Sequence, residues 1–250
     1  MKKPLLIFDL DDTLYDIQYS YALLIDDICR EFCESISFDI PYYLIQTIFR
    51  KNNSKSVKHF GFGKNSFMKA LEITLKDINR IYGLLLTDNH IFHLLASFSK
   101  RYDKLIDTIK FYDFTEEFEQ LIKFYNVKIA TTGDYYYQLE KFKRTGLDRF
   151  TEIEFNVIKK DMNGWLKVLP NYNISNKIIM VGDNIHCDYL PIEPLIDKFY
   201  YIKHEIPFKE IDDNTIAVDI LNDKIIVYPS NFFKNDKEEL GIYKVIHELI

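Results

Sequence analysis

Residues 5–16 constrain the fold of this chain most, because an apolar run ends there abruptly in acidic residues. Residues 5–8 are all apolar, as is typical of a strand buried on both faces of a parallel sheet. Asp9 and Asp11 follow, and alternation along an extended chain points both side chains the same way. Two crowded carboxylates repel each other unless a cation lies between them. The pattern therefore predicts a site for a hard ion such as Mg²⁺, with one aspartate as nucleophile and the other transferring protons.

Composition narrows the class of protein. With 250 residues, 47% hydrophobic and 28% charged, the chain can form one large α/β domain or a core with a modest insertion. The net charge of −6 argues against a nucleic-acid partner, because phosphate backbones bind basic surfaces. A small phosphorylated ligand in a local basic pocket remains compatible with this charge.

The N-terminal and cysteine patterns indicate where the chain functions. Asp9 ends the first apolar stretch too early for a signal peptide or a membrane helix, so we expect no membrane association. The three cysteines form no disulfide pattern, which favours a reducing, cytoplasmic location. Cys29 and Cys33 lie one helical turn apart and lack a second pair of ligands, so we expect a helix face rather than a metal site.

Apolar spacing divides the chain into a helical part and an α/β part. Residues 17–105 show spacings of three and four without a convincing strand. Residues 51–66 are predicted to form a loop rich in Lys, Asn, Ser and Gly, followed by separate helical segments at 67–75 and 77–82. Alternating strands and helices follow, which implies parallel βαβ units. The predicted strands are 127–131, 153–157, 177–181 and 199–202; the predicted helices are 115–125, 135–145 and 164–169. One strand-like run, 225–228, and a charged helix lie in a tail to which the sequence assigns no role.

Three of the predicted strands end in polar residues that a core does not need. Asp9 and Asp11 follow the first of these strands. The second ends with the hydroxyl residue Thr131, and Thr132 and Gly133 come next, where backbone amides can approach an anion. Gly182 and Asp183 follow a third, with Asp188 five residues later. Because ligands bind beyond the carboxyl ends of parallel strands, these groups predict one site for a cation and an anion, as phosphoryl transfer requires.

These motifs resemble those of the haloacid dehalogenase superfamily. Residues 9–13 match its first motif, Asp-x-Asp-x-Thr after an apolar strand, and Thr131 matches the hydroxyl of the second. Gly182, Asp183 and Asp188 match the fourth. The third motif is a lysine, for which the chain offers Lys159 and Lys160; Lys160 is favoured because an acidic residue and an aromatic one follow it at the family's spacing. The resemblance spans roughly residues 4–205.

The resemblance implies a fold and a mechanism. The expected fold is an α/β, Rossmann-like parallel sheet flanked by helices (residues 1–16 and 106–250) with an inserted all-helical C1-type cap (17–105). Asp9 would be the nucleophile and Asp11 the acid–base group. The Mg²⁺ ligands would be Asp9, the backbone carbonyl of Asp11, Asp183 and Asp188, and Thr13 would orient the first-motif loop. Asp12 and Asp16 are expected to be solvent-facing or capping rather than catalytic. The phosphoryl oxygens would be bound by Thr131, Thr132, Gly133 and Lys160, of which Thr131 and Lys160 also count as catalytic.

The implied function is Mg²⁺-dependent hydrolysis of a small phosphorylated metabolite through an aspartyl-phosphate. Asp11 argues against a haloacid dehalogenase, which lacks the second aspartate of the first motif. A phosphomutase, which shares every core residue, and a catalytically idle member that binds a ligand or a partner stay open. The sequence identifies neither the substrate nor the oligomeric state.

Overall fold

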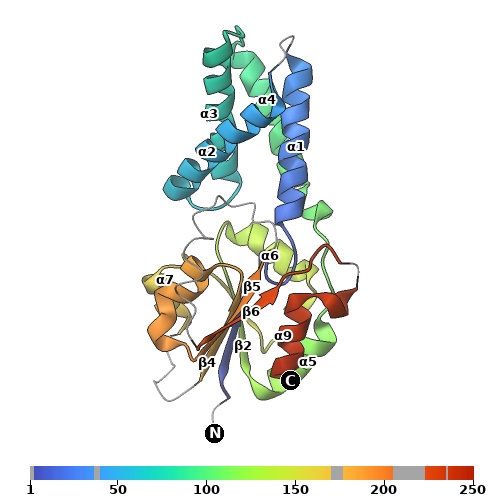
Figure 1. Ribbon diagram of the computed structural model, residues 1–250, viewed down its shortest axis with the longest axis vertical. Helices are drawn as coiled ribbons and strands as arrows, with labels where there is room; N and C mark the ends of the chain where they lie inside the picture. The colour runs from blue at the N-terminus through green and yellow to red at the C-terminus, as the bar shows by residue number, and fades with distance from the viewer. Residues whose placement is uncertain (1–2, 37–39, 170–176, 205–222, 235) are drawn as a thin grey trace. The chain divides into compact units, whose positions relative to one another are not determined.

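The computed structural model describes residues 3–36, 40–169, 177–204, 223–234 and 236–250. The chain divides into two compact units, one formed by residues 1–17 with 110–250 and the other by 18–109. In the described residues, the first unit holds every strand and the second holds helices only. The predicted fold class is confirmed: a Rossmann-like parallel sheet flanked by helices, with an inserted all-helical unit (Figure 1).

Over the described ranges, the sheet has six strands in the order β3-β2-β1-β4-β5-β6, and every pair is parallel. The central strand β1 is completely buried, as its uninterrupted apolar run predicts. Leu6 of β1 pairs with Val127 on one side and Ile179 on the other. The strands are β1 (Leu5–Phe8), β2 (Asn126–Thr131), β3 (Glu154–Val157), β4 (Ile178–Gly182), β5 (Lys198–Lys203) and β6 (Ile225–Pro229).

Helices cover both faces of the sheet (Figure 1). Side chains of β1 alternate between the faces: Phe8 contacts Phe118 of α5 with 5.0 Å between ring centroids, whereas Ile7 packs in the core that contains Trp165 of α7. The helices of this unit are α5 (Thr115–Phe124), α6 (Tyr135–Arg144), α7 (Met162–Val168) and α9 (Gly241–Leu249).

The C-terminal tail, to which the sequence assigned no role, completes this unit. Strand β6 pairs with β5 from Phe199↔Ile225 to Lys203↔Pro229. Helix α9 buries Ile242, Val245 and Ile246, and lies beside α5 on the face opposite α7 (Figure 1). The tail therefore adds a sixth strand and a covering helix to the α/β core.

The helical unit corrects two predictions. The segment 51–66, predicted as a loop, is mostly helical, because α2 continues through residue 60 and α3 begins at residue 64. One of its polar residues has polar partners on the next helix: the Asn52 side-chain amide donates to Thr74 Oγ1 at 3.2 Å and to Asp77 Oδ2 at 3.2 Å. The separate helices predicted for 67–75 and 77–82 are one helix. The helices are α1 (Gln18–Ser35), α2 (Tyr42–Phe60), α3 (Lys64–Tyr82) and α4 (Asp88–Asp103). None of the helices in the described ranges is long and apolar enough to cross a membrane.

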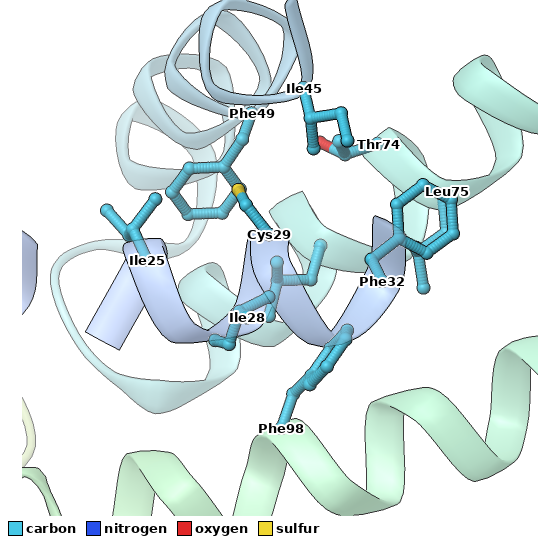
Figure 2. Close-up of a pocket in the computed structure, with 10 residues that line it drawn as sticks. Ile25, Ile28, Cys29, Phe32, Ile45, Phe49, Thr74, Leu75 and Phe98 are labelled. Carbon is cyan, nitrogen blue, oxygen red and sulfur yellow. The ribbon is translucent and has the colours of Figure 1, made fainter. Parts of the chain in front are cut away.

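A small apolar cavity of about 10 Å³ lies among the four long helices of this unit (Figure 2). Ile28 and Cys29 of α1, Phe49 of α2 and Phe98 of α4 are among the residues that line it. The volume suffices for about one water molecule, but an apolar lining offers such a water few partners. We therefore regard the cavity as a packing feature of the helical core.

Cys29 is expected to be unreactive in the folded protein. Its side chain is 2% exposed, and burial raises the pKa of the thiol to about 12, so the reactive thiolate is scarce at neutral pH. Iodoacetamide at pH 8 should leave Cys29 unmodified in the native protein and modify it after denaturation, as measured by peptide mass spectrometry. Rapid native modification of Cys29 would contradict this packing.

Candidate active site

The polar residues predicted at the strand ends meet where the strand order reverses. Asp9 follows β1 and Asp183 follows β4, and these two strands are neighbours in the sheet. The Asp9 amide donates to the Val181 carbonyl at 2.9 Å, which continues the strand pairing up to the first aspartate. In an open parallel sheet the crevice beyond the carboxyl ends at such a point is the usual ligand site.

Three carboxylates converge there. Oxygens of Asp9, Asp183 and Asp188 all lie within 4.8 Å of one another, and Asp9 and Asp188 are buried. Asp188 reaches the cluster because it packs directly on Gly182, where a Cβ atom would lie 2.5 Å from Asp188 Oδ2. The backbone amide of Asn184 also donates to that oxygen at 3.0 Å. A glycine at the end of β4 thus makes room for the third carboxylate.

Lys160 neutralises part of this charge. Its Nζ lies 2.6 Å from Asp9 Oδ1 and 2.6 Å from Asp188 Oδ1, and its side chain is only 5% exposed. Burial alone would lower the pKa of Lys160, but the carboxylates of Asp188 and Asp9 outweigh it and raise the pKa above its ordinary value. Lys159, the alternative third-motif lysine, is 87% exposed and pairs with Asp161. The structure therefore brings Lys160, and not Lys159, to the cluster.

The cluster fits a divalent cation. Its three carboxylates carry a formal charge of −3 against one lysine, and hard oxygen ligands of this kind suit Mg²⁺. Burial raises the pKa of Asp188 to about 6, although the nearby ammonium group of Lys160 opposes the shift. A group of buried carboxylates with one cation is short of positive charge, which a bound metal ion would supply.

The Asp11 side chain is bound by a different set of partners. Lys141 Nζ lies 2.5 Å and 2.6 Å from its two oxygens, the Tyr15 hydroxyl donates to Oδ1 at 2.6 Å, and the Gln138 amide donates to Oδ2 at 2.9 Å. Burial tends to raise the pKa of Asp11, but these donors, Lys141 foremost, hold the pKa below its usual value. The predicted metal contact of Asp11 is through its backbone carbonyl, and its carboxylate is not one of the three in the cluster.

Sequence reasoning missed Lys141 and Gln138. Both lie on α6, which begins shortly after the second-motif threonine, and both are buried, at 1% and 4% exposure. A lysine and a glutamine three residues apart on a helix are typical of a solvated face, so the local pattern did not indicate that these two side chains are buried. The available signal was the place of this helix, Tyr135–Arg144, which begins directly after the second-motif residues Thr131 to Gly133.

The predicted phosphate-binding residues lie at the end of the neighbouring strand. Thr131 is the last residue of β2 and is 1% exposed, two residues after the partner of Phe8 in the register with β1. Gly133 has φ +129°, a conformation that favours glycine, just before α6 begins. The carbonyl of Thr132 accepts from the Gln138 amide at 2.6 Å, which ties this turn to the group around Asp11.

Two other residues of the first-motif loop differ in how they are held. In the part of the chain that the structure describes, the buried hydroxyl of Thr13 has no hydrogen-bond partner, so its expected orienting role gains no support from a hydrogen bond. Asp12, expected to be solvent-facing or capping, is 5% exposed and adopts φ +60°. Its Oδ1 accepts from the Ile17 amide at 3.0 Å, and its carbonyl lies 2.8 Å from His204 Nε2. Asp12 therefore acts in the turn rather than at the surface.

Replacement of Gly182 by alanine should displace Asp188. The added Cβ would lie 2.5–2.9 Å from three side-chain atoms of a fully buried residue, so the carboxylate must move. We expect Gly182→Ala to weaken Mg²⁺ binding by about 10- to 100-fold, the range for a lost supporting contact at a metal site. Calorimetric Mg²⁺ titration measures this directly. Equal Mg²⁺ affinity in the variant, with an unchanged melting temperature, would show that Asp188 is not a ligand.

No family model and no curated protein matches the chain, but solved structures do. A protein provisionally named the HAD-hydrolase YfnB, from Bacillus subtilis and bound to magnesium, is 18% identical over 89% of this chain and 100% of its own (TM-score 0.55). A provisional β-phosphoglucomutase from Thermotoga maritima is 17% identical and covers 100% of both chains (0.60). A 2-haloacid dehalogenase from Pseudomonas syringae is 18% identical over 100% of this chain and 98% of its own (0.58).

These likenesses establish the fold. The resemblance inferred from the motifs is confirmed at that level, since the neighbours share the haloacid dehalogenase-like architecture over nearly their whole lengths. Their names cover different reactions, so the fold alone does not select one.

Proposed function

We propose that this chain, which has the fold of the haloacid dehalogenase-like hydrolases, is a Mg²⁺-dependent phosphatase that hydrolyses a small phosphorylated metabolite. The observation that carries the proposal is the cluster of Asp9, Asp183 and Asp188 with Lys160 buried among them. Phosphoryl transfer is governed by positioning and by neutralising negative charge; the cluster would position the reacting groups, and the charge would be neutralised by Lys160 and a bound Mg²⁺.

Asp9 is the proposed nucleophile. Lys160 Nζ and the Leu10 amide both contact the same oxygen, Oδ1, at 2.6 Å and 2.7 Å. These contacts fix the carboxylate, and we assign the attack to the other oxygen, Oδ2. Lys160 also supplies a positive charge for the phosphoryl oxygens, together with Thr131, the Thr132 amide and Gly133. The carboxylates of Asp9, Asp183 and Asp188, with the Asp11 carbonyl, would hold Mg²⁺, whose charge would stabilise the phosphoryl group.

The reaction balances in two steps. First, an Asp9 oxygen bonds to phosphorus as the bond to the leaving oxygen breaks, and Asp11, which is ionised at rest beside Lys141, relays the proton of the monoanionic phosphate ester to that oxygen. Then a water oxygen bonds to phosphorus, the bond to Asp9 breaks, and a proton of the water passes to Asp11. Inorganic phosphate leaves with that proton, and both aspartates return to their starting states.

The two alternative chemistries differ in how the site supports them. In dehalogenation the halide leaves without taking up a proton, so an acid–base group such as Asp11 would have no role. Here four side-chain contacts hold the Asp11 carboxylate in place, which favours a reaction that uses it. A phosphomutase would use every residue of the proposed mechanism and hand the phosphoryl group to an alcohol instead of water. The chain shares its fold with the provisional β-phosphoglucomutase, and this likeness supports the mutase as the second candidate.

Hydrolysis of p-nitrophenyl phosphate tests the proposal. Wild-type protein should release p-nitrophenol and inorganic phosphate in equal amounts with Mg²⁺ and release neither after treatment with EDTA. Incubation with 2-chloropropionate should release no chloride. Turnover that survives chelation, or chloride release, would overturn the proposal. p-Nitrophenol without an equal amount of inorganic phosphate would favour the mutase.

A further inference from the structure

Lys141 is a buried cation that the mechanism above does not use. Its side chain is 1% exposed, although lysine is almost never fully buried unless it is paired. The pairing is with Asp11: Nζ lies 2.5 Å from one carboxylate oxygen and 2.6 Å from the other. A lysine that contacts both oxygens of one carboxylate restricts its rotation as well as balancing its charge.

Gln138 and Tyr15 complete the group around Asp11. Gln138 precedes Lys141 by one helical turn, and its amide donates to Asp11 Oδ2 at 2.9 Å and to the Thr132 carbonyl at 2.6 Å. Tyr15, which is completely buried, donates its hydroxyl to Oδ1 at 2.6 Å. Each oxygen of Asp11 therefore receives two contacts, and we call Lys141, Gln138 and Tyr15 the Asp11 clamp.

The clamp separates the two aspartates of the first motif. Asp9 is bound by Lys160, which precedes α7, whereas Asp11 is bound by two residues of α6. Two carboxylates only two residues apart are thus anchored by different lysines, one in the segment before α7 and the other in α6. Such anchoring fixes the orientation of the Asp11 carboxylate independently of the carboxylate cluster that contains Asp9.

We propose that Lys141, supported by Gln138, is a positioning residue that aims the Asp11 carboxyl group at the oxygen of the leaving group. This inference rests on the proposed phosphatase function, because it assigns Lys141 a role through Asp11. Lys141 acts on neither phosphorus nor the metal. Its removal frees Asp11 to rotate away from the position where proton transfer is efficient, so the loss depends on how much the leaving group needs a proton.

Comparing two substrates that differ in this need tests the proposal. p-Nitrophenolate leaves readily as an anion, whereas phenoxide benefits strongly from protonation. We expect Lys141→Met to lower kcat/KM for phenyl phosphate by about 10²-fold or more, within the range for lost acid–base catalysis. The loss for p-nitrophenyl phosphate should be at least tenfold smaller. The matched control is Lys143→Met, which removes an exposed lysine from the same helix and should change neither value.

Gln138→Met is the second variant, for use if Lys141→Met does not fold. It removes one donor without removing a charge, and the same leaving-group dependence is expected with a smaller amplitude. Equal losses for both substrates would mean a structural role and would overturn the proposal. A wild-type protein that hydrolyses neither substrate would overturn the phosphatase function and the role of Lys141 with it. A wild type that hydrolyses both, beside variants with equal losses, would overturn the role of Lys141 alone.

Discussion

Asp9→Asn is expected to abolish phosphatase activity while the protein stays folded. The substitution keeps the size of the side chain but removes the carboxylate that we propose attacks phosphorus. Loss of a catalytic nucleophile costs up to about 10⁶-fold in kcat, and we expect a fall of at least about 10⁴-fold here. The amide can still accept a hydrogen bond from Lys160, which also keeps its contact with Asp188. Steady-state hydrolysis of p-nitrophenyl phosphate measures the loss, and circular dichroism confirms folding.

Asp16→Asn is the matched control for this experiment. It makes the same chemical change at the end of the same loop, at a residue outside the carboxylate cluster. Its activity should stay close to that of the wild type. Turnover in folded Asp9→Asn at more than a small fraction of the wild-type rate would remove Asp9 from the nucleophile's role, even if the metal dependence persisted.

Lys160→Met should destabilise the metal-free protein strongly. Lys160 is 5% exposed and lies between Asp9 and Asp188, which are themselves buried. Removing one partner of a buried ion pair leaves uncompensated charge and costs about 3–5 kcal/mol. We expect a loss of this size in the free energy of unfolding, measured by urea denaturation with EDTA. Mg²⁺ should recover part of it, since a cation bound to the carboxylates of the folded state stabilises that state.

The neighbouring lysine provides the control. Lys159 is 87% exposed and pairs with Asp161 at the surface, so Lys159→Met should change stability by no more than about 0.5 kcal/mol. If the two variants lost the same stability, Lys160 would not be the cation that the buried carboxylates require. A Lys160→Met protein too unstable to purify can be replaced by Lys160→Arg, which keeps the charge and should retain most of the stability.

Local patterns predicted the α/β core well because they depend on neighbours along the chain. The unbroken apolar run of β1 indicates burial on both faces, and the structure exposes none of its residues. The same kind of run marked β2, β4 and β5 to within one residue at each end. Local composition failed for residues 51–66, where Asn52 and Ser56 are polar yet buried in α2. The Asn52 amide is satisfied by Thr74 and Asp77 of α3, partners that composition does not reveal.

The candidate site divides in the same way. The spacing of Asp9 and Asp11, and of Asp183 and Asp188 after a glycine, determined from the sequence alone that acids would gather at the ends of neighbouring strands. The choice between two adjacent lysines was harder, because both lie in one short segment. Only the tertiary structure separated them, by placing one against two carboxylates and the other in solvent.

What the sequence by itself determined is the sheet and the chemical groups at its carboxyl edge, since both follow from the order of residues along each strand. The tertiary structure alone decided which charges are paired. Lys141 reads as a surface residue of α6, yet it is buried against Asp11 from a segment 130 residues away. The sixth strand and α9 likewise acquire a role only by packing on the sheet. The partner of a charged side chain depends on which elements meet across the core, and that is a property of packing rather than of local sequence.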